Sequence, residues 1–250
     1  MKIHSRIKNR ISRHTTRLGI KGLNQLNLPN ALLIIPDGNR RWARAHGLAP
    51  EKGHWAGGET VIKMLGAFKE LNIKVIGLWA FGEDNWKREK HEIDNIMGVV
   101  KEVTKKNLEV MKKNGIKFVV VWNKERIKKE YPDLVKVLEN AVRETAHNSG
   151  KTFAVFLDYG ERFQLEEFAK ARKKDKSATT YEILSRINAG LPLFDMVART
   201  SGEQRLSGFG PLASIAEFVV IKKNLPEVDV KDIILAFKEY SGRKRRLGGN

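Results

Sequence analysis

Five short apolar runs, separated by longer stretches with helical periodicity, constrain the fold of this chain most strongly. The runs lie at residues 31–35, 75–81, 116–122, 153–157 and 194–197. Runs of this length without polar alternation are typical of strands buried on both faces. Helical spacing predicts helices at residues 60–71, 89–113, 131–149, 181–189 and 230–240, and polar residues 172–180 read as a connection. This alternation predicts a single α/β domain, with a mainly parallel central sheet and helices on both faces.

Residues 1–30 differ from the rest of the chain, because they carry seven Lys or Arg and no acidic residue. We treat them as a basic N-terminal extension that precedes a domain at residues 31–250. Ile3, Ile7, Ile11 and Leu18 could form an apolar face on a basic helix, which would suit an anionic membrane surface. A solvated arm and an Arg-rich organellar presequence are the alternatives.

The overall charge predicts an anionic partner. Lys and Arg number 47 against 29 acidic residues, giving a formal net charge of +18. Nucleic acid, anionic lipid and diphosphates all fit this charge. The chain has no cysteine, so a bound metal must take oxygen or imidazole ligands, which favours magnesium. No apolar run approaches the roughly 18 residues of a membrane-spanning helix.

Chemistry is expected after the apolar runs, because ligands of open parallel sheets bind beyond the carboxyl ends of strands. The first such segment runs Pro-Asp-Gly-Asn-Arg-Arg-Trp at residues 36–42. Glycines there would let the backbone approach a phosphate, and the arginines would hold it. Asp37 would carry a magnesium ion that bridges to the phosphate. Asp-Gly-Asn is also a common turn, so spacing alone leaves both readings open.

Two further segments follow apolar runs in the same way. Residues 80–88, Ala-Phe-Gly-Glu-Asp-Asn-Trp-Lys-Arg, place aromatic rings beside an amide and two cations. Residues 198–207, Ala-Arg-Thr-Ser-Gly-Glu-Gln-Arg-Leu-Ser, form a candidate anion cradle, since an arginine fork binds phosphate oxygens in pairs. A surface turn with Trp86 in the core and a solvated basic loop are the respective alternatives.

Taken together and in this order, the three segments resemble the signature regions of the cis-prenyltransferase (undecaprenyl diphosphate synthase) family. Tyr-Gly-Glu-Arg at residues 159–162, Glu217 and Arg-Arg-Leu-Gly-Gly at residues 245–249 add to the resemblance, which covers residues 31–250. The family implies a hydrophobic tunnel between sheet and helices, a homodimer and the cofactor Mg²⁺. It also implies transfer of an allylic prenyl diphosphate to isopentenyl diphosphate with formation of a cis double bond.

The resemblance assigns roles to individual residues. Asp37 and Asn85 are the expected catalytic residues, and Asp37 and Glu217 the expected metal ligands. The expected substrate-binding residues are Gly38, Asn39, Arg40, Arg41, Trp42, His54, Phe81, Gly82, Trp86, Arg88, Arg199, Arg205 and Ser207. Catalysis would rest on positioning and charge stabilisation, without a covalent intermediate.

Several positions depart from the family pattern. Arg40 and Gly82 replace a glycine and a serine, Pro50 stands where many members have an arginine, and residues 208–214 read Gly-Phe-Gly-Pro-Leu-Ala-Ser in place of Asn-Phe-Leu-Leu-Trp-Gln. These changes predict an altered acceptor or product length, with an alcohol as one alternative acceptor. A non-catalytic accessory subunit is a second alternative, and a nucleic-acid-binding module is disfavoured because no such motif is present. The expected location is cytoplasmic, with or without peripheral membrane contact.

Overall fold

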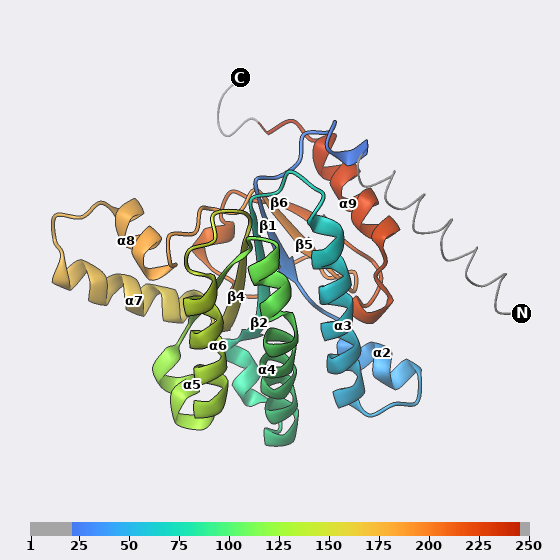
Figure 1. Ribbon diagram of the computed structural model, residues 1–250, viewed down its shortest axis with the longest axis horizontal. Helices are drawn as coiled ribbons and strands as arrows, with labels where there is room; N and C mark the ends of the chain where they lie inside the picture. Colours follow the sequence, from blue (N-terminus) through green and yellow to red (C-terminus); the bar gives the residue numbers. More distant parts are fainter. Residues whose placement is uncertain (1–21, 246–250) are drawn as a thin grey trace, which may run out of the picture.

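Six parallel strands form one sheet at the centre of the computed structural model, which describes residues 22–245 (Figure 1). In chain order the strands are Ala31–Ile35 (β1), Val75–Gly82 (β2), Lys117–Trp122 (β3), Thr152–Tyr159 (β4), Met196–Arg199 (β5) and Glu217–Val220 (β6). Their spatial order is β3-β4-β2-β1-β5-β6. All five residues of β1 are buried, as expected for a central strand covered on both faces.

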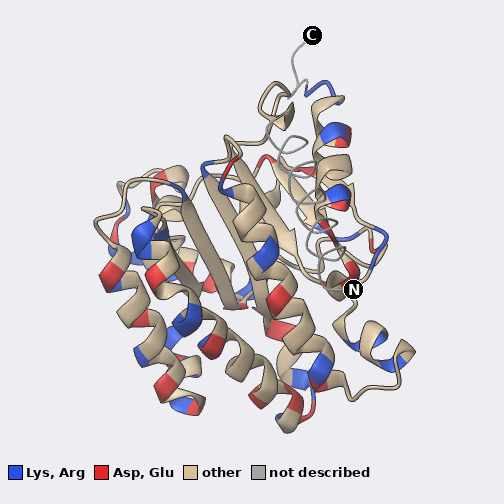
Figure 2. Cartoon of the chain, turned by 45° about the vertical axis from the view of Figure 1, so that its right-hand side comes forward, with Lys and Arg blue, Asp and Glu red and all other residues tan. Residues whose placement is uncertain are grey.

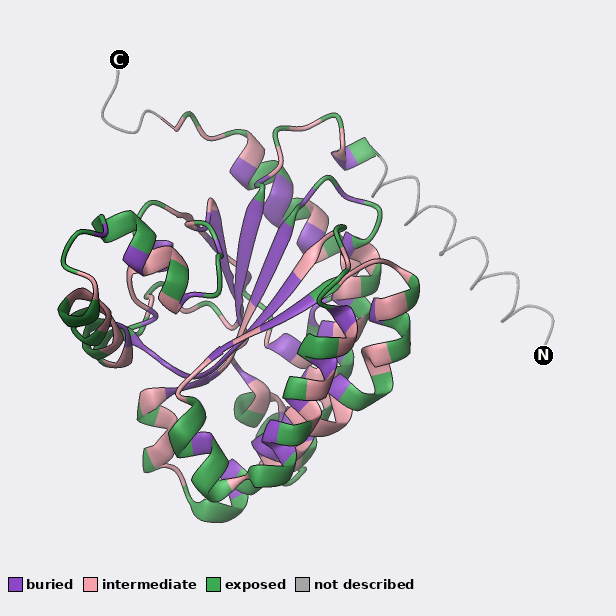
Figure 3. Ribbon diagram, turned by 60° about the vertical axis from the view of Figure 1, so that its left-hand side comes forward, coloured by how far each residue is buried: buried purple, intermediate pink, exposed green. Residues whose placement is uncertain are grey.

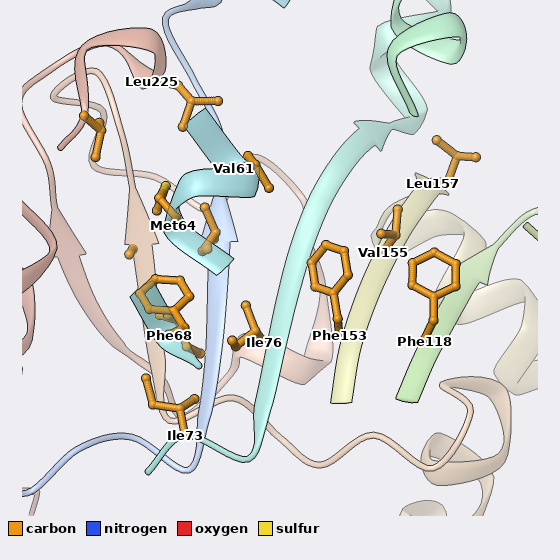
Figure 4. Packing of buried hydrophobic residues seen from close by; sticks show 14 of the residues in the cluster. Val61, Met64, Phe68, Ile73, Ile76, Phe118, Phe153, Val155, Leu157 and Leu225 are labelled. Atoms are coloured by element: carbon orange, nitrogen blue, oxygen red, sulfur yellow. The ribbon is translucent and has the colours of Figure 1, made fainter. Parts of the chain in front are cut away.

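One face of the sheet packs against four long helices. They are Pro50–Phe68 (α3), Lys90–Lys113 (α4), Pro132–Thr145 (α6) and Val230–Ser241 (α9), and Lys124–Glu130 (α5) precedes α6. Apolar side chains of these helices meet alternate strand residues in the larger core. Figure 4 shows Phe118, Phe153 and Val155 on this face of the sheet, and Val61 and Phe68 from α3. The outer faces of the helices stay exposed (Figure 3).

The opposite face packs against a smaller core in which Phe156, Tyr159, Phe194 and Phe209 meet in edge-on and tilted pairs. Chain segments between β4 and β6 cover this face. They include the helices Glu161–Lys174 (α7) and Thr180–Ile187 (α8) and the short turn Pro211–Ala213 (η2). The prediction of an α/β domain with a parallel sheet between helical layers is therefore confirmed.

Several predicted boundaries were wrong. α3 begins at Pro50, ten residues before the predicted start, because a proline fits the first turn of a helix and the glycines at 53, 57 and 58 allow close packing. Residues 172–174 belong to α7, so the connection is shorter than predicted. The predicted loop after β1 contains the helix Asn39–Ala45 (α2). β6 was not among the predicted strands.

The strand order places a topological switch point at β1. The chain passes from β1 to β2 on one side and later returns to β5 on the other side of β1. Crevices beyond the carboxyl ends of strands at such points are the usual ligand sites of open parallel sheets. The segments after β1, β2 and β5 are the three that the sequence analysis selected. No helix within residues 22–245 is both long and apolar enough to cross a bilayer.

Candidate active site

Asp37 and Arg199 meet at the carboxyl ends of β1 and β5. Ile35 of β1 lies in register with Arg199 of β5, so Asp37, two residues later, reaches the arginine side chain. Arg199 Nη2 donates to Asp37 Oδ2 at 2.9 Å, and Arg41 Nη2 donates to Oδ1 at 3.0 Å. Burial raises the pKa of Asp37, but hydrogen bonds from Arg199, the Gly38 amide and Arg41 outweigh it, so the pKa is lowered. Asp37 is therefore ionised at neutral pH.

Thr200 locks the two strand ends together. Its hydroxyl accepts from the Asp37 amide and donates to the Asp37 carbonyl, both at 2.7 Å. Gly38 follows with φ 91°, a conformation that favours glycine, and a Cβ there would lie 2.3 Å from Asn224 Oδ1. The backbone around the Asp37 carboxylate is therefore fixed before any ligand arrives.

A buried carboxylate organises the cations on the other side of Asp37. Glu92, at the start of α4, is 7% exposed. It accepts from Arg88 at 2.9 Å, His54 Nε2 at 3.2 Å and Arg40 at 3.4 Å. Burial lowers the pKa of His54, and the opposing effect of Glu92 is smaller. His54 Nδ1 lies 3.5 Å from Asn39 Nδ2.

The segment after β5 forms the second group of cations. Arg199 Nη1 donates to Ser207 Oγ at 2.8 Å and also to the Arg205 carbonyl. Ser201 and Ser207 have φ values of 72° and 52°, so the segment folds back on itself toward Arg199. Arg205 is exposed and pairs with Glu203, which also binds Arg41 at 3.0 Å. Glu203 thus holds Arg41 and Arg205 beside each other at the pocket.

The turn after β2 is anchored from β4. Asn85, in the short helix Glu83–Lys87 (η1), accepts the Gly82 amide at 3.0 Å. Trp86 Nε1 donates to the fully buried Asp158 at 2.7 Å, while the ring packs edge-on against Phe81. The aromatic residues thus support the turn, and Asn85 borders the pocket.

These groups surround one pocket of about 730 Å³ at the switch point. Of the predicted site residues, the pocket wall includes Asp37, Gly38, Arg40, Arg41, His54, Gly82, Asn85, Arg88, Arg199, Arg205 and Ser207. Asn39, Trp42, Phe81 and Trp86 lie outside the wall, and Phe81 is completely buried. Positive charge dominates the half around Asp37, whereas Glu83, Asp84, Glu161 and Arg162 border the rest of the wall.

Glu217 lies at the other end of the sheet. It is the first residue of β6, in register with Met196 at the start of β5, whereas Asp37 follows the carboxyl end of β1. Its carboxylate pairs with Arg243 at 3.0 Å. Within one chain, Asp37 and Glu217 are therefore not brought together.

An apolar cavity of about 340 Å³ adjoins the pocket. It runs between the sheet and helices α3 and α4, from Pro36 and Leu225 at one end to Asn114 and Lys151 at the other. Pro36, His54, Ala80 and Ile96 line both spaces. The predicted tunnel between sheet and helices is thus present, and it opens directly beside the cationic groups.

The donor set around Asp37 fits magnesium only with help from a ligand. Among residues 22–245 there is no cluster of three His, Asp or Glu side chains that could hold a metal. Magnesium is commonly bound by one or two carboxylates together with phosphate oxygens and water. Asp37 faces the pocket with its side chain 27% exposed, so it can supply that one carboxylate.

The sequence analysis missed several residues that shape the site. Thr200 and Glu203 lay inside a selected motif without an assigned role, and Arg44 and Glu92 were not selected. The sequence could have indicated that Glu92 is a buried partner of Arg88. Glu92 follows Arg88 by four residues and stands among the apolar positions of α4. Arg44 borders the pocket as part of α2, whose helical character the Asp-Gly-Asn turn pattern concealed.

Comparison with known proteins identifies the family. The family model described as "Putative undecaprenyl diphosphate synthase" matches residues 35–248. An isoprenyl transferase of Fusobacterium nucleatum is 34% identical, covering 89% of this chain and 97% of its own length. An isoprenyl transferase of Agrobacterium fabrum is 30% identical, covering 89% and 93%. The crystal structure of lavandulyl diphosphate synthase from Lavandula x intermedia, in complex with dimethylallyl diphosphate, shares the fold with a TM-score of 0.80 at 24% identity, covering 88% of this chain and 98% of that one. The chain therefore belongs to the undecaprenyl diphosphate synthase family and is an enzyme of the cis-prenyltransferase type.

Proposed function

We propose that this enzyme condenses an allylic prenyl diphosphate with isopentenyl diphosphate, with Mg²⁺, to give a cis-prenyl diphosphate. The observation that carries the proposal is the junction between pocket and cavity. Ala80 and Ile96 line both the cationic pocket and the apolar cavity. A diphosphate head with a hydrocarbon tail is the kind of ligand that needs both surfaces side by side.

The allylic diphosphate is assigned to the side of Asp37 that Glu92 organises. Arg40, Arg41 and His54, together with the backbone at Gly38, border the pocket next to the cavity entrance. Arginine forks and backbone amides are suited to diphosphate oxygens. The prenyl tail would then extend along α3 and α4, away from the charges.

Isopentenyl diphosphate is assigned to Arg199, Arg205 and Ser207. These three side chains lie on one segment, and the hydrogen bond from Arg199 to Ser207 keeps them together. Asn85 stands across the pocket in η1, where its amide can orient the reacting pair. The Asp37–Arg199 contact supports neighbouring positions for the two diphosphates.

The reaction requires that the allylic carbon–oxygen bond break and leave diphosphate. The double bond of isopentenyl diphosphate then attacks the allylic carbon, and loss of one proton forms the new alkene. The arginines stabilise the negative charge that develops on the leaving diphosphate. Asp37 would hold Mg²⁺, which neutralises diphosphate charge when bound. We assign no shared metal site to Asp37 and Glu217 of one chain; a role for Glu217 would need another subunit of the expected homodimer.

The segment before β6 bears on the choice of acceptor. Gly208, Gly210 and Pro211 give the segment before β6 its own shape, with φ values of 79° and 99° at the two glycines. The pocket half bordered by Glu83 and Glu161 is open to a neutral acceptor such as an alcohol. The accessory-subunit alternative is disfavoured because Asp37, Arg41, Arg199 and Arg205 are all retained around one pocket.

The test is an incubation of the purified chain with labelled isopentenyl diphosphate, Mg²⁺ and allylic diphosphates of increasing length. Parallel reactions replace isopentenyl diphosphate with prenyl alcohols or omit Mg²⁺ in the presence of a chelator. We expect metal-dependent products with cis double bonds from isopentenyl diphosphate. Turnover only with an alcohol would support the alternative acceptor, and turnover in chelator would contradict the role of Asp37. No turnover alone, but stimulation of an added catalytic relative, would support the accessory subunit.

A further inference from the structure

The apolar cavity has a second end, far from the cationic pocket. Its lining at this end includes Lys69 after α3, Val110 and Asn114 at the end of α4, and Lys151 before β4. Val110 is 52% exposed although it lines the cavity. The cavity therefore reaches the protein surface at the amino ends of the strands, the upper end in Figure 1.

The spacing of α3 and α4 explains this opening. A Cβ added at Gly58, near the start of α3, would lie 2.9 Å from Val99 and 3.3 Å from Val103 of α4. The two helices thus touch at Gly58, whereas farther along the cavity lies between them, lined by Leu65 of α3 and Val110 of α4.

Lysines surround this opening without matching acids. Lys74, Lys151 and Lys117 stand side by side at the amino ends of β2, β4 and β3, since Thr152 donates to the Lys74 carbonyl and Lys117 to the Lys151 carbonyl. Lys69 and Lys113 lie at the carboxyl ends of α3 and α4. None of these five lysines pairs with a carboxylate within residues 22–245. Basic segments at this end, and at the opposite one, are coloured blue in Figure 2.

The nearby acids do not cancel this charge. Glu109 and Glu144 both pair with Lys112 of α4. Glu70 is the remaining carboxylate beside the α3 end, and it is exposed. The surface formed by Lys69, Lys74, Lys113, Lys117 and Lys151, called the lysine rim below, is therefore strongly positive.

The basic extension joins the chain at the same end. Asn24 donates to the Glu70 carbonyl at 2.8 Å and accepts from the Asn72 amide at 2.9 Å, which fixes residues 22–26 beside the end of α3. The 21 residues before Gly22 carry seven Lys or Arg and no acid. Five lysines thus surround the opening, and the sequence that precedes Gly22 carries seven more cationic residues.

From these features we infer that the lysine rim docks on an anionic phospholipid bilayer, with the second opening of the cavity facing the acyl chains. The rim supplies attraction to lipid headgroups, and the cavity gives a growing prenyl chain an apolar path into the bilayer. The part concerning the prenyl chain rests on the proposed function. The docking itself does not, because it needs only the charges and the opening.

Vesicle sedimentation of the full chain tests the docking without any substrate. The probes are vesicles of phosphatidylcholine alone and of equal parts phosphatidylcholine and phosphatidylglycerol. Reversing two rim charges with Lys69→Glu and Lys113→Glu should weaken binding to the anionic vesicles by about tenfold or more. The charge-matched control, Lys173→Glu with Lys174→Glu on α7, should bind like wild type. Circular dichroism confirms folding of each variant.

A labelled cysteine tests the orientation, because the chain has no cysteine of its own. Val110→Cys carries an environment-sensitive dye beside the opening, and Leu165→Cys on α7, 63% exposed in the native chain, is the control. Anionic vesicles should shift the emission to the blue at position 110 alone.

Several results would overturn the inference. These are equal binding to both kinds of vesicle, equal loss in the α7 control, a blue shift at both labelled positions or at neither, and binding to RNA without binding to vesicles. A chain that docks as described but does not transfer prenyl groups would contradict only the proposed function.

Discussion

The Arg199 guanidinium donates to the Asp37 carboxylate at 2.9 Å and so joins the carboxyl ends of β5 and β1. Arg41 binds the same carboxylate, and also Glu203. The groups assigned to metal and diphosphate thus pair with one another in the structure. A diphosphate can take over the arginines and free Asp37 oxygens for Mg²⁺, so binding of metal and substrate should be coupled.

Replacing Asp37 with Asn should lower kcat by roughly 10²–10³-fold, the size of effect seen when one preorganised electrostatic group is lost. The side chain keeps its shape but loses the charge that we propose holds Mg²⁺. Initial rates with labelled isopentenyl diphosphate at saturating donor and Mg²⁺ measure this change.

Asp84→Asn is the matched control, because Asp84 borders the same pocket but is exposed and pairs with Lys87 and Arg162. It should leave the rate within a few-fold of wild type. Equal losses in both variants would show that pocket charge in general, and not Asp37, supports the reaction.

His54 should make the enzyme less stable as pH falls. Burial lowers the pKa of His54 in the folded chain, whereas the unfolded chain keeps a value near 6.5. The unfolded state therefore binds more protons below that value, and stability is lost as pH falls through the folded-state pKa. The loss of unfolding free energy between pH 7.5 and pH 5, measured by urea unfolding, should be smaller for His54→Gln than for wild type. An unchanged or larger difference would contradict this assignment.

Gly38 should tolerate no side chain. Alanine there would add strain at φ 91° and contacts below 3 Å with Asn224 and Ser201, for a loss of about 1–3 kcal/mol of unfolding free energy. Gly47→Ala distinguishes backbone strain from close contacts, because Gly47 has a φ of 63° but a Cβ there would meet nothing within 4 Å. Urea unfolding should show a smaller loss for Gly47→Ala than for Gly38→Ala. Equal losses would mean that backbone strain alone, and not the close contacts, causes the loss of unfolding free energy at Gly38.

Much of the sheet could be predicted from sequence because its strands are buried on both faces. β1 was predicted to the residue, since all of Ala31–Ile35 is apolar and Pro36 ends the run. α2 was missed because Asp-Gly-Asn suggests a turn, although Gly38 in fact supplies the left-handed residue just before the helix. Trp86 is held by Asp158, which is distant in sequence, so local pattern could not show that Phe81 and Trp86 lie outside the pocket wall.

The neighbourhood of Asp37 and Arg199 was expected because both follow strands, and strand ends meet at one edge of a parallel sheet. The position of Glu217 was not expected, because β6 was not recognised. The direction of β6 determines which end of the sheet Glu217 occupies. The second opening of the cavity depends on how α3 and α4 pack, and helix periodicity carries no such information.

Ala80→Phe should separate the reaction of short donors from that of long ones. Ala80 lines both the pocket and the cavity, so a phenyl ring there narrows the passage between them. The proposed diphosphate positions lie on the pocket side, so the shortest donor should retain most of its kcat/KM. Donors whose tails must enter the cavity should lose at least tenfold, because the tail would have to displace the ring. Val121→Phe, at a buried position on the other face of the sheet, controls for general core damage. A uniform loss across all donors, or a loss confined to the shortest, would show that the prenyl tail does not pass Ala80.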